Sequence, residues 1–195
     1  MLIPSTPAAD TEVCMVCDDP NRAPEHPLPQ GFTLRTFRPG DENVWVAIHR
    51  DGDQRLKVTQ ETFEDQFGRD MEGMKDRCFF LVSPEGREIG TGTAWYGVHG
   101  GRECGRVHWI CLVKEQQGRG LAKPLLSAVM KRLARSHDRC YLTTSTSRIA
   151  AIGLYLRFGF RPVVTSPEQA RAWWRVAGAL DHRILRKALD TDGRC

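Results

Sequence analysis

Two closely spaced glycines constrain this chain most, because they separate an apolar, strand-like run from a helix-like run. The stretch EQQGRGLAKPLL covers residues 115–126 and has Gly118 and Gly120 near its centre. A turn from strand to helix exposes the first backbone N–H groups of the helix, which lack helical partners and carry the positive end of its dipole. Glycine has no Cβ, so a bulky anion can reach those donors. The stretch therefore predicts a phosphate-binding loop.

Strand and helix patterns alternate on both sides of this loop. Apolar runs typical of strands cover residues 32–36, 78–82, 88–96, 106–113, 140–144 and 160–164. Helical patterns follow the turn at Asp41, begin near Thr59 with Phe63, Phe67 and Met71 at four-residue steps, and cover residues 120–135, 148–158 and the stretch after Ser166. This alternation predicts an α/β fold whose mixed central sheet carries helices on both faces.

The chain has 195 residues, which is enough for one well-buried core. Prolines crowd into residues 1–30, where there is little apolar periodicity. We therefore expect a Pro-rich flexible tail over residues 1–30 and a single domain over residues 31–195. The stretch HRILRKAL near the C-terminus fits either a last strand or a helix.

The composition argues against a membrane or nucleic acid as a partner. No run approaches the roughly 18–20 apolar residues that span a bilayer, and the first ten residues do not resemble a secretory signal. We therefore expect a cytoplasmic protein with no membrane partner. A net charge of +4 is too small to indicate nucleic acid. A homodimer is left open.

The seven cysteines are odd in number and scattered, which favours reduced thiols. Only Cys14 and Cys17 have the spacing of metal ligands, and a structural zinc usually needs a second pair. We expect no metal, and the role of these two cysteines is left open.

The loop does not fit the common nucleotide-binding motifs. A Walker loop needs a longer glycine spacing and a Lys-Ser/Thr ending, and a dinucleotide loop needs a third glycine. Residues 117–122, QGRGLA, instead match Q/R-x-x-G-x-G/A, which resembles the pyrophosphate loop of the GCN5-related N-acetyltransferase (GNAT) superfamily. A second stretch, RIAAIGLYLRFGF, resembles the closing motif of that family, N-x-x-A-x-x-L-Y-x-x-x-G-F, with Arg148 in place of the usual Asn.

The resemblance covers about two-thirds of the chain, from Phe32 to Val164. It implies a single GNAT-like domain with splayed middle strands, and acetyl-CoA as cosubstrate. The implied reaction is acetyl transfer to a primary amine, of a small molecule or a peptide, by direct attack. The alternative is a non-catalytic module that binds coenzyme A and serves regulation or an interaction. Such a module would need the loop but neither the catalytic acid nor the base.

The resemblance also implies the cofactor-binding residues. The N–H of Leu112 would stabilise the oxyanion, and Arg119 and Lys123 would contact the outer phosphates. The full set is Leu112, Val113, Gln117, Gly118, Arg119, Gly120, Leu121, Ala122 and Lys123.

Two catalytic residues follow in the same way. Tyr155 matches the tyrosine that protonates the sulfur of coenzyme A. Two-residue alternation puts Arg106, His108, Ile110 and Leu112 on one face of their strand. The family often places a general base there, and His108 fits, although a histidine hydrogen-bonded within the core fits too. His99 and Glu103 are further candidates.

The acidic second helix corresponds by position to the border of the acceptor cleft in the family. Glu61, Glu64 and Asp65 would favour a cationic amine there. A solvated helix face is the other interpretation.

Overall fold

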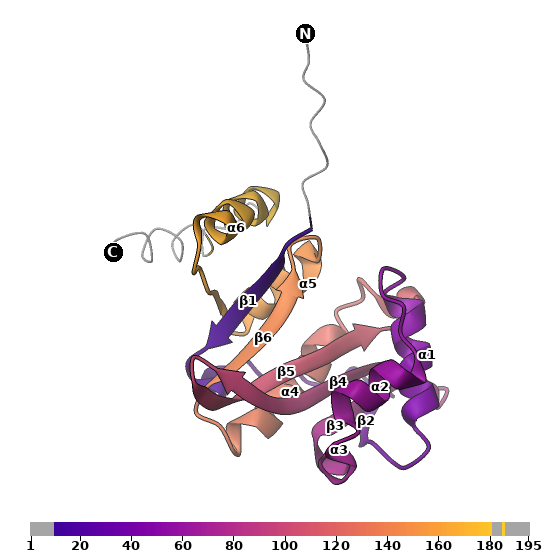
Figure 1. Cartoon of the computed structure of the whole chain (residues 1–195). Coiled ribbons are helices and arrows are strands. Elements are labelled where there is room, and N and C mark those ends of the chain that lie inside the picture. Colours follow the sequence, from indigo (N-terminus) through magenta and orange to yellow (C-terminus); the bar gives the residue numbers. More distant parts are fainter. Residues whose placement is uncertain (1–9, 181–184, 186–195) are drawn as a thin grey trace. The chain divides into compact units, whose positions relative to one another are not determined.

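The computed structural model describes residues 10–180 and Leu185 (Figure 1). These residues form two compact units. The larger unit is Asp19–Cys140, and the smaller unit combines residues 10–18 with residues 141–180 and Leu185. Within the described residues, no helix is both long and apolar enough to cross a membrane.

The larger unit contains four antiparallel strands in the order β2-β3-β4-β5. They are β2 (Thr33–Thr36), β3 (Cys78–Val82), β4 (Glu88–His99) and β5 (Arg102–Leu112). Gly100 and Gly101 alone join β4 to β5, and both have the positive φ that a two-residue hairpin turn favours. The strand predicted to start at Arg106 therefore begins four residues earlier.

Helices cover both faces of this sheet (Figure 1). Phe80 of β3 packs in the cluster that contains α1 and α2 residues, whereas the next residue, Leu81, packs with Leu125 of α4. Successive strand residues point to opposite faces, so α1 and α2 cover one face and α4 the other. The helical segments are η1 (Pro20–Arg22), α1 (Glu42–Gly52), α2 (Gln60–Phe67), α3 (Met71–Arg77), η2 (Lys114–Gln116) and α4 (Ala122–Ala134).

The helix predicted to begin near Thr59 is two helices. Thr59 caps α2 through reciprocal bonds with Thr62, which confirms the predicted start. This helix ends at Phe67, with Gly68 as its C-cap. The side chain of Asp70 then accepts a hydrogen bond from the N–H of Gly73 and caps the start of α3. The four-residue spacing of the apolar residues continues across this break, so the periodicity alone did not reveal it.

The smaller unit contains the strands β6-β1-β7 in that order, and two helices. Its elements are β1 (Glu12–Cys17), β6 (Cys140–Ser145, in this unit from Tyr141 on), α5 (Ile149–Arg157), β7 (Arg161–Pro162) and α6 (Pro167–Leu180). Ser166 accepts a hydrogen bond from the N–H of Gln169, so the predicted cap of α6 is confirmed. The ambiguous stretch HRILRKAL lies outside the described residues, except for Leu185.

The predicted tail over residues 1–30 is wrong for residues 12–17. These residues form β1, and Val13, Met15 and Val16 are buried. Met15 pairs with Pro162 of β7. Cys14 and Cys17 stand three positions apart on this strand, so their side chains point to opposite faces and cannot chelate one ion together.

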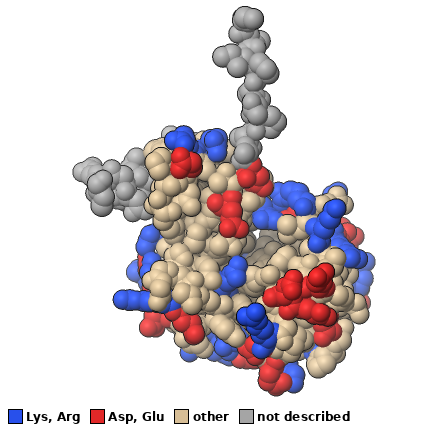
Figure 2. Space-filling view, viewed as in Figure 1, with Lys and Arg blue, Asp and Glu red and all other residues tan. Residues whose placement is uncertain are grey.

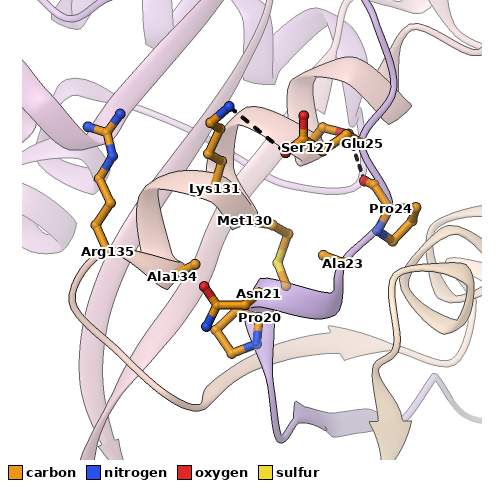
Figure 3. A pocket seen from close by; sticks show the side chains of 10 residues that line it. All are labelled: Pro20, Asn21, Ala23, Pro24, Glu25, Ser127, Met130, Lys131, Ala134 and Arg135. Carbon is orange, nitrogen blue, oxygen red and sulfur yellow. Dashed lines mark hydrogen bonds and ion pairs between the residues drawn. The ribbon is translucent and has the colours of Figure 1, made fainter.

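The proline-rich stretch that follows is also ordered by contacts within the larger unit. Figure 3 shows residues 20–25 lying along α4. The hydroxyl of Ser127 accepts a hydrogen bond from the N–H of His26 and donates one to the carbonyl of Pro24. The carbonyl of Pro24 and the N–H of His26 thus hold this segment to α4, and the tail prediction is wrong here too.

Candidate active site

The glycine loop lies between β5 and α4, as predicted. Gly118 and Gly120 have φ values of 75° and 80°, which side chains other than glycine rarely adopt. A Cβ added to either glycine would meet open space. Glycine is therefore needed here for its conformation, and it also leaves the loop backbone open to a ligand.

The start of α4 offers donors to an anion. Leu121 at the N-cap makes no side-chain capping bond. The first N–H groups of a helix lack partners within it. The N–H of Lys123 bonds the carbonyl of Gly120, and Pro124 has no N–H, so Leu121 and Ala122 are the residues whose N–H groups can serve a ligand here. The side chain of Leu121 itself is buried in the cluster with Leu125, so only its backbone can serve the ligand.

Gln117, predicted to bind the cofactor, turns its side chain toward the protein. Its Nε2 donates to the carbonyl of Gly52 at 2.8 Å and to the carbonyl of Leu112 at 2.9 Å. A Cβ on Gly52 would lie 2.2 Å from the Leu112 oxygen, so α1 and β5 approach closely only because residue 52 is glycine. Gln117 thus holds the loop against the ends of α1 and β5.

The two predicted phosphate-binding cations flank the loop. Arg119 is exposed and its Nη1 donates to the Gln116 side chain, whereas Lys123 is half-buried in the first turn of α4. Both are near enough to the loop in sequence to serve an anion there, and their phosphate contacts stay a prediction.

The end of β5 presents one backbone N–H to the side away from β4. The N–H of Val113 donates to the carbonyl of Ile89 at 2.9 Å, and the preceding residue, Leu112, is paired with Gly90. Hydrogen-bonded and non-bonded pairs alternate along an antiparallel ladder, so the N–H of Leu112 points away from β4. This direction suits the predicted oxyanion donor. The N–H of Val113 is already used within the protein.

A bulge interrupts β5 before this point. Thr93 pairs with His108 and Thr91 pairs with Cys111, so β5 holds one more residue than β4 between these pairs. Trp109, within the bulge, has a φ of 50°, and no other non-glycine residue among those described has a positive φ. A bulge of this kind turns the following residues to the opposite face.

The bulge overturns the predicted alternation along β5. His108, Trp109 and Cys111 all contact the cluster of α1 and α2, whereas Ile110 and Leu112 pack on the α4 side. The prediction that His108 shares a face with Ile110 and Leu112 is therefore wrong. Residues 109–113 are all apolar, so a shift of one residue leaves no mark in their hydrophobic pattern, and the bulge could not be predicted from it.

His108 is buried, with 7% of its surface exposed. Its Nε2 lies 2.9 Å from Oε1 of Gln66 on α2, and its ring packs edge-on against Phe67. Burial, reinforced by the charges of Arg106 and His49, holds the pKa of His108 well below its usual range. The imidazole is therefore neutral near pH 7, which a general base must be and which a core histidine is too.

His49 of α1 adds a second buried imidazole. It packs against Trp45 with ring centroids 4.2 Å apart and against Trp109 at 4.9 Å. Burial lowers its pKa to about 3. His49, Gln66 and Trp109 were not predicted as site residues, because each is an ordinary member of a helix or strand in the sequence.

His99 and Glu103 lie at the tip of the β4–β5 hairpin, where Val98 pairs with Glu103 and His99 with Arg102. Glu103 is nine residues before Leu112 on β5, which corresponds to about 30 Å of strand. Neither side chain is placed to serve a reaction at Leu112.

The acidic face of α2 points to solvent. Glu61, Glu64 and Asp65 are exposed, whereas Phe63 and Phe67 are buried. Figure 2 shows acidic side chains gathered in the region of α2. The arrangement fits a solvated helix face.

The second motif ends α5 with a Schellman turn. Gly159 has a φ of 84°, its N–H bonds the carbonyl of Leu156, and the N–H of Phe160 bonds the carbonyl of Tyr155. The rings of Tyr155 and Phe160 pack edge-on at 6.0 Å. The Tyr-x-x-x-Gly-Phe spacing is therefore a helix ending that also fixes Tyr155, which is 8% exposed.

Arg148 stands at the N-cap of α5 and makes no side-chain capping bond there. Asp10 bonds the residues just before this N-cap: its carboxylate accepts bonds from the N–H and hydroxyl of Ser147 and from the hydroxyl of Ser145. An acidic residue just before β1 thus orders the turn that leads to α5.

Known proteins resemble this chain in sequence and in fold. The model of the Acetyltransferase (GNAT) family matches residues 43–160. Mycothiol acetyltransferases from Streptomyces griseus and Salinispora tropica are 33% and 35% identical over 68% and 70% of the chain. These matches cover 44% and 47% of those proteins, so the chain spans about half the length of the curated relatives it matches.

Solved structures agree in fold. A GCN5-related N-acetyltransferase from Sphaerobacter thermophilus aligns with a TM-score of 0.64 at 24% identity, over 79% of this chain and 48% of that one. The ribosomal-protein-S18-alanine N-acetyltransferase from Escherichia coli aligns with a TM-score of 0.54 at 20% identity, over 68% and 79%. The predicted α/β class is confirmed, whereas the splay of the middle strands, the single domain and the site residues stay predictions. The predicted tail over residues 1–9 lies outside the described residues. The chain belongs to the GNAT acetyltransferase family.

Proposed function

We propose that this protein transfers an acetyl group from acetyl-CoA to a primary amine by direct attack. The observation that carries the proposal is the loop of Gly118 and Gly120, whose two positive φ values leave open backbone before a helix with no side-chain cap. Backbone N–H groups of this loop and of Leu121 and Ala122 hold the pyrophosphate. Arg119 and Lys123 add positive charge.

We assign one residue to each of three tasks in the reaction: oxyanion stabilisation, proton removal and protonation of the leaving group. The amine nitrogen attacks the thioester carbon, and the N–H of Leu112 stabilises the resulting oxyanion, a contribution of about 3 kcal/mol for such a donor. His108 accepts the proton from the attacking nitrogen. The C–S bond then breaks, and Tyr155 donates a proton to the departing thiolate.

The acceptor is a small-molecule amine. Family membership supports an amine, and relatives named mycothiol acetyltransferases support a small molecule over a peptide. Amines related to mycothiol therefore head the panel of acceptors to be tested, ahead of polyamines, amino acids, aminoglycosides and peptides.

A thiol-release assay with acetyl-CoA and this panel tests the proposal. We expect amine-dependent release of coenzyme A, strongly reduced in Tyr155→Phe while acetyl-CoA binding measured by calorimetry stays intact. Unchanged release in Tyr155→Phe would remove the tyrosine from the mechanism. Binding without release for every amine would favour the coenzyme A-binding module instead.

A further inference from the structure

One amide oxygen on α2 accepts two hydrogen bonds from the bulge of β5. Oε1 of Gln66 lies 3.1 Å from Nε1 of Trp109 and 2.9 Å from Nε2 of His108. An indole nitrogen can only donate, so the Gln66 atom that faces it is the carbonyl oxygen. An oxygen can only accept here, so Nε2 of His108 carries a proton and donates it to Gln66.

The hydrogen bond decides which nitrogen of His108 is basic. A neutral imidazole carries one proton, so with that proton on Nε2 the lone pair lies on Nδ1. We propose that Gln66 is a positioning residue, which fixes His108 in the Nε2–H tautomer and presents Nδ1 as the atom that accepts the proton of the amine. The catalytic part of this inference rests on the proposed function, whereas the tautomer does not.

The same oxygen helps to hold the bulge. A non-glycine residue at a positive φ is strained and persists only where its surroundings fix it. The indole of Trp109 is fixed by Gln66 and by ring contacts with Trp45 at 5.0 Å and His49 at 4.9 Å. Gln66 thus connects α2, the bulge and His108 through a single atom.

The charges that face His108 are those of Arg106 on β5 and of His49 on α1, whenever that second imidazole is protonated. Both oppose protonation of His108. A carboxylate in place of the Gln66 amide would keep the acceptor and add a negative charge, so Gln66→Glu is expected to raise the pKa of His108.

Side-chain ¹⁵N NMR of the full chain, labelled at histidine, tests the tautomer directly, with His108→Asn to assign the signals. We expect the Nε2–H form alone in the wild type and a mixture of both tautomers in Gln66→Leu. The matched control is Gln60→Leu on the same helix, whose side chain bonds Asn43 instead and should leave His108 unchanged. An Nδ1–H form in the wild type, or an unchanged tautomer in folded Gln66→Leu, would overturn the proposal.

Steady-state kinetics distinguish a role of Gln66 in positioning His108 from a purely structural role. We expect Gln66→Leu to lower kcat about tenfold without changing KM for acetyl-CoA, because it misplaces a base rather than the cofactor loop. Gln66→Glu should recover activity and move the acid limb of the pH–rate profile to higher pH, since a base with a raised pKa is protonated at higher pH. An acid limb that stays in place in Gln66→Glu would contradict the inference.

Failure of the proposed function would look different. If His108→Asn kept full activity, His108 would not be the base, and the catalytic part of the inference would fall with it. The NMR result would still decide whether Gln66 sets the tautomer.

Discussion

The two sides of the end of β5 are built in opposite ways. On one side, the loop of residues 117–120 is exposed and offers backbone shaped by positive-φ glycines. On the other, Trp45, His49 and Trp109 form a packed aromatic cluster, with Trp45 fully buried. The contrast suggests that the loop side binds the ligand and the cluster side supplies the rigidity that holds β5 in place.

Trp45→Ala, on the cluster side, should lower the stability of the protein more than the two changes that follow. The side chain is 0% exposed and packs on Phe63, Phe67 and Trp109, so its removal should lower the free energy of unfolding by about 3–5 kcal/mol. Urea denaturation measures the loss. Trp174→Ala on α6 is the control, because Trp174 is 49% exposed. Equal losses in the two variants would contradict the assignment of rigidity to the cluster.

Low pH should have the second-largest effect, by destabilising the folded protein through His49 on the cluster side. The folded protein holds the pKa of His49 at about 3, below its ordinary 6.5, so the neutral form is favoured by folding. The contribution of neutral His49 to the free energy of unfolding is fully present above pH 6.5 and is lost as pH falls toward 3. At pH 4 the loss from His49 alone is roughly 3 kcal/mol. The free energy of unfolding measured across pH should fall less steeply in His49→Gln. The same slope in both proteins would contradict the prediction.

Gln117→Ala, on the loop side, should give the smallest loss of stability of the three changes. It removes two hydrogen bonds to the carbonyls of Gly52 and Leu112, each worth about 1 kcal/mol. We expect a loss of about 1–2 kcal/mol in the free energy of unfolding and a raised KM for acetyl-CoA, measured by denaturation and steady-state kinetics. Gln54→Ala, an exposed position just after α1, serves as the control. An unchanged KM in Gln117→Ala would show that the loop does not need this support.

The sequence predicted the loop side well because its physics is local. Gly118 and Gly120 mark the turn from strand to helix within a few residues of sequence, so the loop could be located without a structure. Their positive φ values are a finding of the structure. The capped start of α2 at Thr59 was predictable for the same reason.

The cluster side was not predictable, because its key features are contacts between distant segments. The bulge at Trp109 adds one residue to β5 without changing its composition, and Gln66 meets His108 across 42 positions of sequence. Residues 24–26 were misread likewise, since the hydroxyl that orders them belongs to Ser127 on α4.

Calorimetric titration with acetyl-CoA tests the central claim most directly, with two valine variants at matched backbone conformation. Gly120 and Gly86 have φ values of 80° and 82°, so valine strains both positions alike, but Gly86 lies in the β3–β4 turn. We predict that the wild type and Gly86→Val bind acetyl-CoA with similar affinity, and that Gly120→Val binds at least about tenfold more weakly, a difference of about 1.4 kcal/mol. No binding by the wild type, or equal binding by all three proteins, would contradict the account.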